Sequence, residues 1–378
     1  MRFLSILHFL SMDVAMKRFV FIIFALLLAG CGAAAPEAVE TTAFVTEPAI
    51  VEAETVAAET EETTFSTETE PAEERFLLTF VGDCTFGASP SNYYAGVGFI
   101  KTVGEDYGHP FRNVMRYFEN DEATFANLEG PLTDSGNPVQ KKHTFRGPTD
   151  YVRILTENSV EAVSIANNHT HDYGQTGYAS TVKTLEDAGV PFVDRDSSCI
   201  FITENGLKIG LYGAVYYQLD TEAIVAAIAS LKEGGCDLVI FAPHWGVEGT
   251  YRPTEAQVEL AHAVIDAGAD IVWGSHPHVL QPVERYGDGV IYYSLGNFSF
   301  GGNGYPRDYD TALIRQEVIR SADGSIALGE MILVPANVSS EPNRNNYQPT
   351  PYEMGEEGYE RAMKKLDGTW DGHNLPIQ

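Results

Sequence analysis

Short apolar segments alternate with amphipathic ones along most of the chain, and this alternation restricts the fold more than any other feature. Seven apolar runs have the length of buried strands, at residues 76–81, 123–127, 162–166, 208–212, 238–242, 271–273 and 290–295. Helical patterns lie between them, at residues 151–157, 177–188, 222–231 and 254–267. This alternation predicts βαβ units with helices packed on the faces of a sheet. The expected fold class is therefore α/β.

The pattern changes after residue 310. Two strand-like stretches, at residues 312–319 and 326–334, follow one another without a helix between them. They predict a hairpin that completes a second sheet. Beyond residue 339 the chain is polar and loop-like, apart from one short helical pattern at residues 360–366. The whole of residues 75–370 is expected to form one domain.

The N-terminus has the form of an export signal. Lys17 and Arg18 precede an uncharged apolar run at residues 19–28, which is too short for a comfortable membrane span. The run leads into Leu28-Ala29-Gly30-Cys31, which resembles the lipobox of bacterial lipoproteins, whose cysteine carries the lipid. Residues 1–31 are therefore expected to be a lipoprotein signal peptide with Cys31 as the lipidation site, and an ordinary signal peptide is the alternative. We expect an extracytoplasmic, membrane-anchored protein.

Charge and cysteine content limit the possible partners and scaffolds. The formal net charge of −29 argues against a nucleic-acid partner. Residues 32–74 are rich in Ala, Thr, Glu and Pro and contain no Lys or Arg, so we expect a disordered, self-repelling stalk. The three cysteines other than Cys31 allow at most one internal disulfide, which excludes a disulfide-stapled scaffold.

Six short polar motifs share one position, because each follows an expected strand. They are Gly82-Asp83, Asn127-Leu128-Glu129, Asn167-Asn168-His169 with Asp172 and Gly174, His244-Trp245-Gly246 with Glu248, His276-Pro277-His278, and Ser294-Leu295-Gly296-Asn297-Phe298. In open α/β sheets, ligands bind at the carboxyl ends of strands. The motifs offer carboxylates, a side-chain amide and imidazoles, which zinc, manganese or iron accept as donors. His276 and His278, two apart on an extended segment, would point the same way and serve one site.

The order of these motifs is similar to that of the calcineurin-like metallophosphoesterases: an Asp, a Glu, an Asn-His, a His and a His-x-His. The amino-acid sequences of the motifs resemble those of one branch of that superfamily, the CapA-type capsule biosynthesis proteins linked to poly-γ-glutamate. The resemblance spans about residues 75–350. It rests on Phe80-Val81-Gly82-Asp83, Asn127-Leu128-Glu129, Ala166-Asn167-Asn168-His169 with Asp172-Tyr173-Gly174, Gly274-Ser275-His276-Pro277-His278 with Gln281, Ser294-Leu295-Gly296-Asn297-Phe298 and Gln348-Pro349.

The resemblance implies both a fold and a site. The fold would be a four-layer αββα sandwich, with two mixed sheets between helices. Two divalent cations (Mn, Zn or Fe) would bind at one edge of the sheets, with Glu129 as the bridging carboxylate. The implied ligands are Asp83, Glu129, Asn168, His244, His276 and His278. His169 would stand beside the cations and protonate a leaving group, while Asp172 would either orient His169 or hold a turn with Gly174.

The first motif departs from the family pattern. Typical metallophosphoesterases have Asp-x-His there, whereas Asp83 is followed by Cys84 and Thr85. The site therefore lacks one imidazole, and one cation is short of a ligand. Cys84 could substitute, although its side chain should point away from that of Asp83 if the strand continues. The second motif has Glu129 where phosphoesterases have Asp.

Four further residues are candidates for substrate contact. Arg146 belongs to a basic cluster at residues 141–146, which could receive an anionic substrate or be a solvated loop. Trp245 could form a wall of the cleft, although a buried tryptophan beside a strand is the commoner outcome. Glu248 would either touch substrate or close a loop. Asn297 is expected to hydrogen-bond the backbone of the site, with a structural turn as the alternative.

Two functions fit these features. The first is a metal-dependent hydrolase that acts on an anionic cell-surface polymer or a phosphoester. The second is a non-catalytic component of a capsule synthesis or export complex that keeps the fold for binding or stability. The expected partners are the anionic polymer or phosphoester, capsule synthase or export subunits, and the membrane through the lipid anchor.

Overall fold

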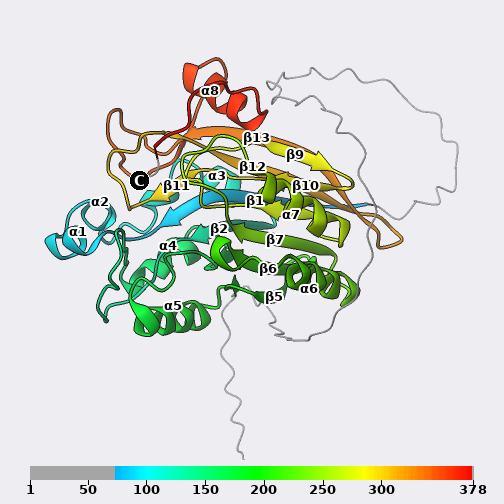
Figure 1. Ribbon diagram of the computed structural model, residues 1–378, viewed down its shortest axis with the longest axis horizontal. Helices are drawn as coiled ribbons and strands as arrows, with labels where there is room; N and C mark the ends of the chain where they lie inside the picture. The colour runs from blue at the N-terminus through cyan, green and yellow to red at the C-terminus, as the bar shows by residue number, and fades with distance from the viewer. Residues whose placement is uncertain (1–72, 377–378) are drawn as a thin grey trace, which may run out of the picture.

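Two β-sheets lie face to face at the centre of the protein, with helices on both outer sides (Figure 1). The computed structural model describes residues 73–376. The expected signal peptide, the lipidation site Cys31 and nearly all of the expected stalk lie outside these residues. Within the described part of the chain, the structure contains no helix of the length and apolarity that a membrane span requires.

The first sheet has eight strands and mixes parallel with antiparallel pairs. Its strands are β1 (Glu74–Thr85), β2 (Ala123–Leu128), β3 (Ala162–Ser164), β4 (Phe192–Val193), β11 (Asn297–Phe300), β12 (Asp310–Arg320), β13 (Ile326–Asn337) and β14 (Thr350–Pro351). The order is β14-β13-β12-β1-β2-β3-β4, with β11 paired to the end of β1. Strands β1 to β4 run parallel, whereas β12, β13 and β14 are antiparallel to their neighbours.

The second sheet has six strands and a parallel centre. Its strands are β5 (Ser197–Ile202), β6 (Lys208–Val215), β7 (Leu238–His244), β8 (Ile271–Trp273), β9 (Val283–Tyr286) and β10 (Gly289–Tyr292). The order is β5-β6-β7-β8-β10-β9. The edge strands β5 and β9 are antiparallel to their neighbours.

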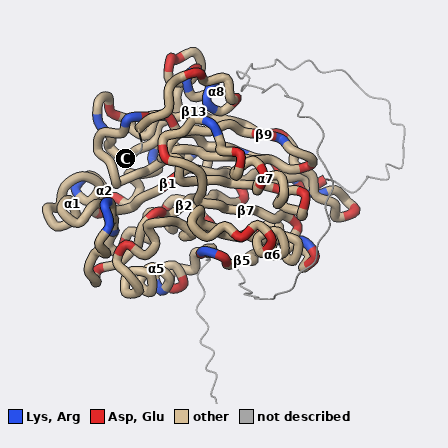
Figure 2. Tube along the Cα trace, viewed as in Figure 1, with Lys and Arg blue, Asp and Glu red and all other residues tan. Residues whose placement is uncertain are grey.

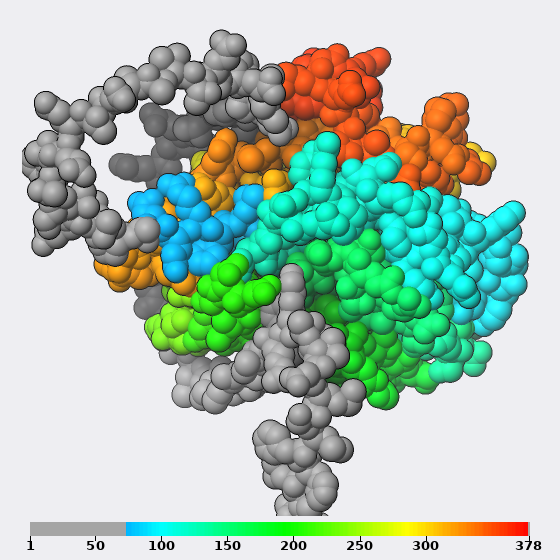
Figure 3. All heavy atoms as spheres, turned by 180° about the vertical axis from the view of Figure 1, so that it is seen from behind, coloured from blue at the N-terminus to red at the C-terminus, as the bar shows by residue number. Residues whose placement is uncertain are grey.

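Helices of very different length cover the two sheets. They are α1 (Pro90–Ala95), α2 (Phe99–Val103), α3 (Met115–Phe118), α4 (Arg153–Thr156), α5 (Gly174–Ala188), α6 (Thr221–Glu233), α7 (Glu255–Asp266) and α8 (Glu357–Leu366), with 3-10 turns η1 (His109–Phe111), η2 (Thr149–Val152) and η3 (Tyr216–Gln218). Helices α2 to α5 pack on the first sheet, and α6 and α7 pack on the second. Seen from behind, the cyan and green segments that contain α2 to α5 form one broad face, and the red C-terminal segment lies above it (Figure 3).

Aromatic side chains fill the space between the two sheets. Phe80 and Phe125 of the first sheet stack at 4.9 Å, and Trp273 of the second lies 5.9 Å from Phe80. The indole of Trp273 also donates a hydrogen bond to Val81 O at 2.9 Å, which ties one sheet to the other. Such aromatic pairs add about 0.5–1.5 kcal/mol to what burial contributes. Helix, sheet, sheet and helix thus make four layers, which confirms the expected αββα sandwich.

The hairpin β12–β13 was expected to complete a second sheet, and this expectation is wrong. β12 pairs with β1 along seven residues, from Glu74 opposite Arg320 to Phe80 opposite Ile314, so the hairpin extends the first sheet. The free edge of β1 is the physical reason, since β2 occupies only its other edge. The domain also continues past residue 370, because Leu375 N donates to Gly249 O at 2.9 Å.

Candidate metal centre

The candidate ligands come from both sheets and meet at one end of the sandwich. The first sheet supplies oxygen donors and the second supplies imidazoles. The donors are Asp83 in β1, Glu129 after β2, Asn168 after β3, His244 at the end of β7, and His276 and His278 after β8. They converge because the carboxyl ends of parallel strands in each sheet open on one side.

Four donor atoms surround one point beside His244. Its Nε2 atom lies 3.0 Å from Asn168 Oδ1, 3.1 Å from His276 Nδ1 and 3.8 Å from Glu129 Oε1. Two ring nitrogens and two side-chain oxygens at these separations suit a cation with donor distances of about 2.0–2.2 Å. These four residues form the first half of the centre.

The tautomer of His244 directs a lone pair at that point. Ser275 Oγ lies 2.8 Å from His244 Nδ1. Because the Ser275 hydroxyl donates its hydrogen bond to Pro243 O at 3.4 Å, its oxygen accepts a hydrogen bond from the Nδ1–H group of His244. The Nε2 atom then carries no proton. Burial, with His276 second, lowers the pKa of His244 well below its usual range. A neutral imidazole with a free lone pair is the form that binds a metal.

Glu129 gives the strongest indication that a cation belongs here. Its side chain is fully buried, and neither carboxylate oxygen has a hydrogen-bond partner in the described chain. Its Oε1 atom lies 3.7–3.8 Å from the Nε2 atoms of His169, His244 and His278, too far for a hydrogen bond. Burial raises the pKa of Glu129 well above its usual range. A buried carboxylate without a donor is costly unless a cation pairs with it, so these residues fit a divalent metal.

Asp83 and His278 form, with Glu129, the second half of the centre. Asp83 Oδ2 lies 3.1 Å from His278 Nδ1, and Asp83 Oδ1 accepts a hydrogen bond from Asn127 Nδ2 at 2.8 Å. Asn297 Oδ1 lies 3.0 Å from the same ring nitrogen, so the Nε2 atom of His278 is the one that faces Glu129. Burial alone would lower the pKa of His278, but Glu129 and Asp83 outweigh it and raise the pKa to about 10.

His276 and His278 were expected to point the same way along an extended segment, and that backbone expectation is wrong. Their φ angles are 97° and 57°, in the left-handed region that L-residues rarely adopt. A tight turn therefore brings both rings to the site, with their centroids 5.9 Å apart. His276 stacks on Tyr216 at 4.6 Å, and burial lowers its pKa to about 3.

His169 is held beside the centre by a chain of charged groups. Its Nδ1 atom lies 2.7 Å from Asp172 Oδ2, which also accepts from Phe145 N at 2.6 Å. Lys141 Nζ pairs with the other oxygen of Asp172 at 2.6 Å and donates to Asn168 O at 2.7 Å. Burial lowers the pKa of His169, although Asp172 opposes the shift. Asp172 thus orients His169 and leaves its Nε2 atom towards the centre.

Two of the residues expected to contact substrate, Trp245 and Arg146, are buried. Trp245 is fully buried between the second sheet and its helices, where its indole donates to Tyr293 O at 2.9 Å. Arg146 is not on a solvated loop, since only 4% of the residue is exposed. Its guanidinium packs over the rings of Tyr93 at 4.2 Å and Tyr173 at 5.1 Å. Aromatic packing explains both positions.

The residues after Asp83 do not restore the missing imidazole. Cys84 is fully buried in the core between the first sheet and its helices, and burial raises the pKa of its thiol. Thr85 donates a hydrogen bond from Oγ1 to Glu129 O at 2.8 Å, so it holds the backbone of the ligand strand. Asn297, expected to bond the backbone of the site, contacts both the ring of His278 and its carbonyl oxygen.

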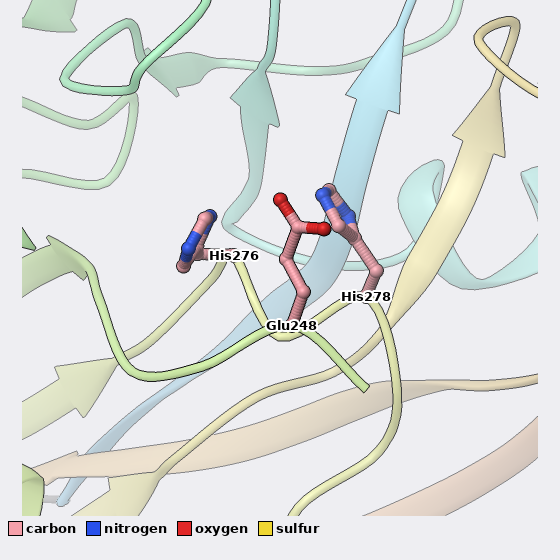
Figure 4. A group of neighbouring side chains, drawn as sticks. All are labelled: Glu248, His276 and His278. Atoms are coloured by element: carbon pink, nitrogen blue, oxygen red, sulfur yellow. The ribbon is translucent and has the colours of Figure 1, made fainter. Parts of the chain in front are cut away.

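Sequence reasoning missed two kinds of residue. Glu248 was expected at most to touch substrate, yet its carboxylate lies between His276 and His278 (Figure 4). Its position four residues after a strand-end histidine was the only signal. The second kind is a pair of asparagines that supports a ligand. Asn167 Nδ2 donates to Asn127 Oδ1 at 3.2 Å, and Asn127 Nδ2 in turn donates to Asp83 Oδ1.

Two openings lie along the loop at residues 301–308. A small cavity of about 30 Å³ adjoins the centre and is lined in part by Glu248, His278 and Asn303. The same loop also borders an open groove of about 640 Å³, lined by Asn92, Gly98, Lys101, Thr102, Gly304, Tyr305, Arg344, Asn345 and Tyr347. Acidic residues are spread over the described surface (Figure 2), but none lines this groove.

A four-layer αββα sandwich with carboxylates, an amide and imidazoles gathered at the strand ends defines a protein of the metallophosphoesterase-like class. A model of the bacterial capsule synthesis proteins, PGA_cap, matches residues 77–302. The chain belongs to this family.

Curated relatives and solved structures give more detail on this similarity. The chain is 30% identical to the capsule biosynthesis protein CapA of Bacillus anthracis over 299 residues, 70% of this chain and 68% of the relative. It is also 30% identical to the PGA biosynthesis protein CapA of Bacillus subtilis, over 65% of this chain and 68% of the relative. Among solved structures, NAD nucleotidase (NadN) of Haemophilus influenzae matches with a TM-score of 0.40 and 13% identity, covering 78% of this chain and 56% of that one.

Proposed function

We propose that this protein is a surface-anchored lipoprotein of capsule synthesis whose metal centre hydrolyses an anionic polymer or a phosphoester. The observation that carries the proposal is Glu129, a fully buried carboxylate with no donor for either oxygen. A centre built around such a group needs cations, and cations in a cleft of this class serve hydrolysis. The names of two relatives, which refer to capsule and PGA biosynthesis, support the biological setting.

The residues divide the chemistry between binding and proton transfer. Divalent cations held by the candidate ligands would supply Lewis acidity and offset negative charge that develops in the reaction. His169 would deliver a proton to the leaving group from its Nε2 atom, because its Nδ1 atom is engaged by Asp172 at 2.7 Å. Lys141, paired with Asp172 at 2.6 Å, keeps that carboxylate in place.

The open groove favours an anionic substrate. Its lining contains Lys101 and Arg344 and no acidic side chain, with Arg344 paired to the neighbouring Glu341, although the whole chain has a net charge of −29. The groove and the cavity beside the centre are close along the chain, because Gly304 lines the groove and the preceding residue, Asn303, lines the cavity. An extended polyanion could therefore contact the groove while one of its bonds lies at the centre.

A second candidate function is a non-catalytic part of a capsule synthesis or export complex. The absent imidazole of the first motif favours it, since Thr85 stands in that place and its hydroxyl donates to Glu129 O. In either case we propose capsule synthase or export subunits as partners and a lipid anchor at Cys31 for attachment to the membrane.

The test compares metal content and hydrolysis in the purified full chain. Wild type should bind divalent metal and cleave either poly-γ-glutamate or a phosphodiester probe, and chelation should abolish the cleavage. The double variant His276→Ala/His278→Ala should lose both properties, whereas His373→Ala, at an exposed position, should keep them. Equal metal content in the double variant and wild type would reject the metal centre. Metal without any cleavage would favour the non-catalytic function.

A further inference from the structure

The loop after β7 carries a carboxylate that is not among the six ligands implied by the family. Glu248 extends from this loop between the rings of His276 and His278 (Figure 4). One of its oxygens and one nitrogen from each ring all lie within 4.8 Å of one another. Donor atoms on opposite sides of a divalent metal are about 4.0–4.4 Å apart, so small movements would let Glu248 and His278 share one ion, while His276 stays with the first half.

Hydrogen bonds to the main chain fix the loop that carries Glu248. Gly249 N donates to Pro277 O at 2.8 Å, and Pro277 is the residue between the two histidines. Gln281 Nε2 donates to Thr250 O at 2.8 Å, a second bond between the two loops. The loop that carries Glu248 is therefore held relative to the histidines, so that the carboxylate needs only a choice of side-chain rotamer to face them.

The two halves of the centre differ in their number of donors. The first half has four, from Glu129, Asn168, His244 and His276. The second half has three, because the imidazole of the first motif is missing: an oxygen of Asp83 within 4.8 Å of one of Glu129, and His278 Nε2 at 3.7 Å from Glu129 Oε1. Cys84 cannot supply the fourth donor, since its side chain lies in the core behind the sheet.

We propose that Glu248 is a metal ligand that replaces the missing imidazole, so that the second half also has four donors and the centre holds two divalent cations. The inference rests on the proposed function only in that the same centre must bind divalent metal. Three carboxylates, from Asp83, Glu129 and Glu248, also offset more of the charge of two such cations than two carboxylates would. A loop carboxylate thus performs a role that belongs to a strand histidine in typical metallophosphoesterases.

The experiment counts metal ions with and without this carboxylate. The purified full chain is stripped of metal and titrated with Mn²⁺, bound ions are counted after desalting, and electron paramagnetic resonance detects a spin-coupled pair. Wild type should bind two ions per chain and give the coupled signal. Glu248→Gln should bind one ion, with at least tenfold weaker binding of the second and no coupled signal. Glu259→Gln, an exposed glutamate of α7, is the matched control and should bind two ions.

The outcomes separate this inference from the proposed function. Two tightly bound ions in Glu248→Gln and also in Glu248→Ala, which lacks the amide oxygen that could still bind a cation, would overturn the ligand role and leave the metal centre intact. A single ion in wild type would overturn the two-cation centre. No bound metal in wild type would overturn the proposed function itself. If Glu248→Gln does not fold, Glu248→Asp, whose carboxylate is one methylene shorter, should show the same weakening of the second ion.

Discussion

At the residue scale, His169 is the side chain whose surroundings most restrict its chemistry. Asp172 engages one ring nitrogen at 2.7 Å, and the ring of Phe145 lies 4.5 Å away, so the imidazole can neither rotate nor leave the centre easily. The other nitrogen lies 3.8 Å from Glu129. A ring with this orientation can transfer a proton to a substrate at the centre without being a metal ligand.

Replacing His169 should therefore affect hydrolysis and spare metal binding. We expect His169→Ala to lower kcat by about 10²–10⁴-fold, the usual contribution of a positioned general acid. Metal content should match wild type. Steady-state kinetics on the substrate that wild type cleaves, together with elemental analysis, check this. His171→Ala, at an exposed neighbouring position, is the control, and loss of metal in His169→Ala would instead make His169 a ligand.

Asp121 should make stability depend on pH. It precedes β2, at the opposite end of that strand from Glu129, and burial raises its pKa to about 7. The folded state then keeps a proton that the unfolded state releases above about pH 4. The free energy of unfolding should fall as pH rises from about 4 to 7, by up to about 1.4 kcal/mol per pH unit, and then level off.

Asp121→Asn should remove this part of the pH dependence. Urea unfolding at pH 5 and pH 8 would show it as a smaller loss of stability between the two pH values than in wild type. The exposed Asp288→Asn is the control and should behave as wild type. An unchanged difference in Asp121→Asn would mean that Asp121 is ionised across this range in the folded protein.

At the scale of elements, α8 depends on a buried ion-pair network. Lys365 is 2% exposed and contacts Asp308 at 2.6 Å and Asp310 at 2.7 Å. Arg361, one turn earlier, pairs with Asp310 at 2.7 Å. The network joins α8 to the start of β12, next to the loop that lines the cavity beside the centre.

Breaking one partner of this network should be costly. Lys365→Met leaves Asp308 without its buried cation, and we expect a loss of about 3–5 kcal/mol in the free energy of unfolding. Chemical unfolding measures the loss. Lys364→Met changes the exposed neighbour on the same helix and should cost little. Equal stability of the two variants would show that the network contributes nothing net.

At the scale of the whole molecule, the candidate centre joins two sheets. Asp83, Glu129 and Asn168 belong to the first sheet, and the three histidines belong to the second. Without a cation, contacts between the sheets such as that of His278 with Asp83 at 3.1 Å and the bond from Trp273 to Val81 O, together with the aromatic core, hold these groups together. Metal binding should therefore stabilise the sandwich as a unit.

Chelation should lower the melting temperature of the whole domain. At a free metal concentration 100 times Kd, one bound ion contributes about 2.7 kcal/mol to the free energy of unfolding. Scanning calorimetry with and without a chelator should show one cooperative transition that moves to lower temperature, and the His276→Ala/His278→Ala variant should show no such shift. A chelator that leaves the wild-type transition in place would contradict a metal shared between the sheets.

The sequence by itself determined nine of the fourteen described strands, the fold class and the residue types of the centre. Apolar runs such as residues 271–273 coincide with β8, because a buried strand must be apolar along its length. Donors such as Glu129 could be located because a polar group directly after such a run needs a partner. Helices α1 to α3 could not be predicted, since four to six residues are too few to show a helical period.

Only the tertiary structure decided how these pieces meet. It placed β12 beside β1, turned Trp245 into the core, and set Glu248 between His276 and His278. Each of these depends on contacts between residues far apart in the chain, such as the bond from Gly249 N to Pro277 O, and no local pattern encodes them. Local sequence patterns therefore identified the donor residues, whereas the packing of the two sheets determined how those residues are arranged.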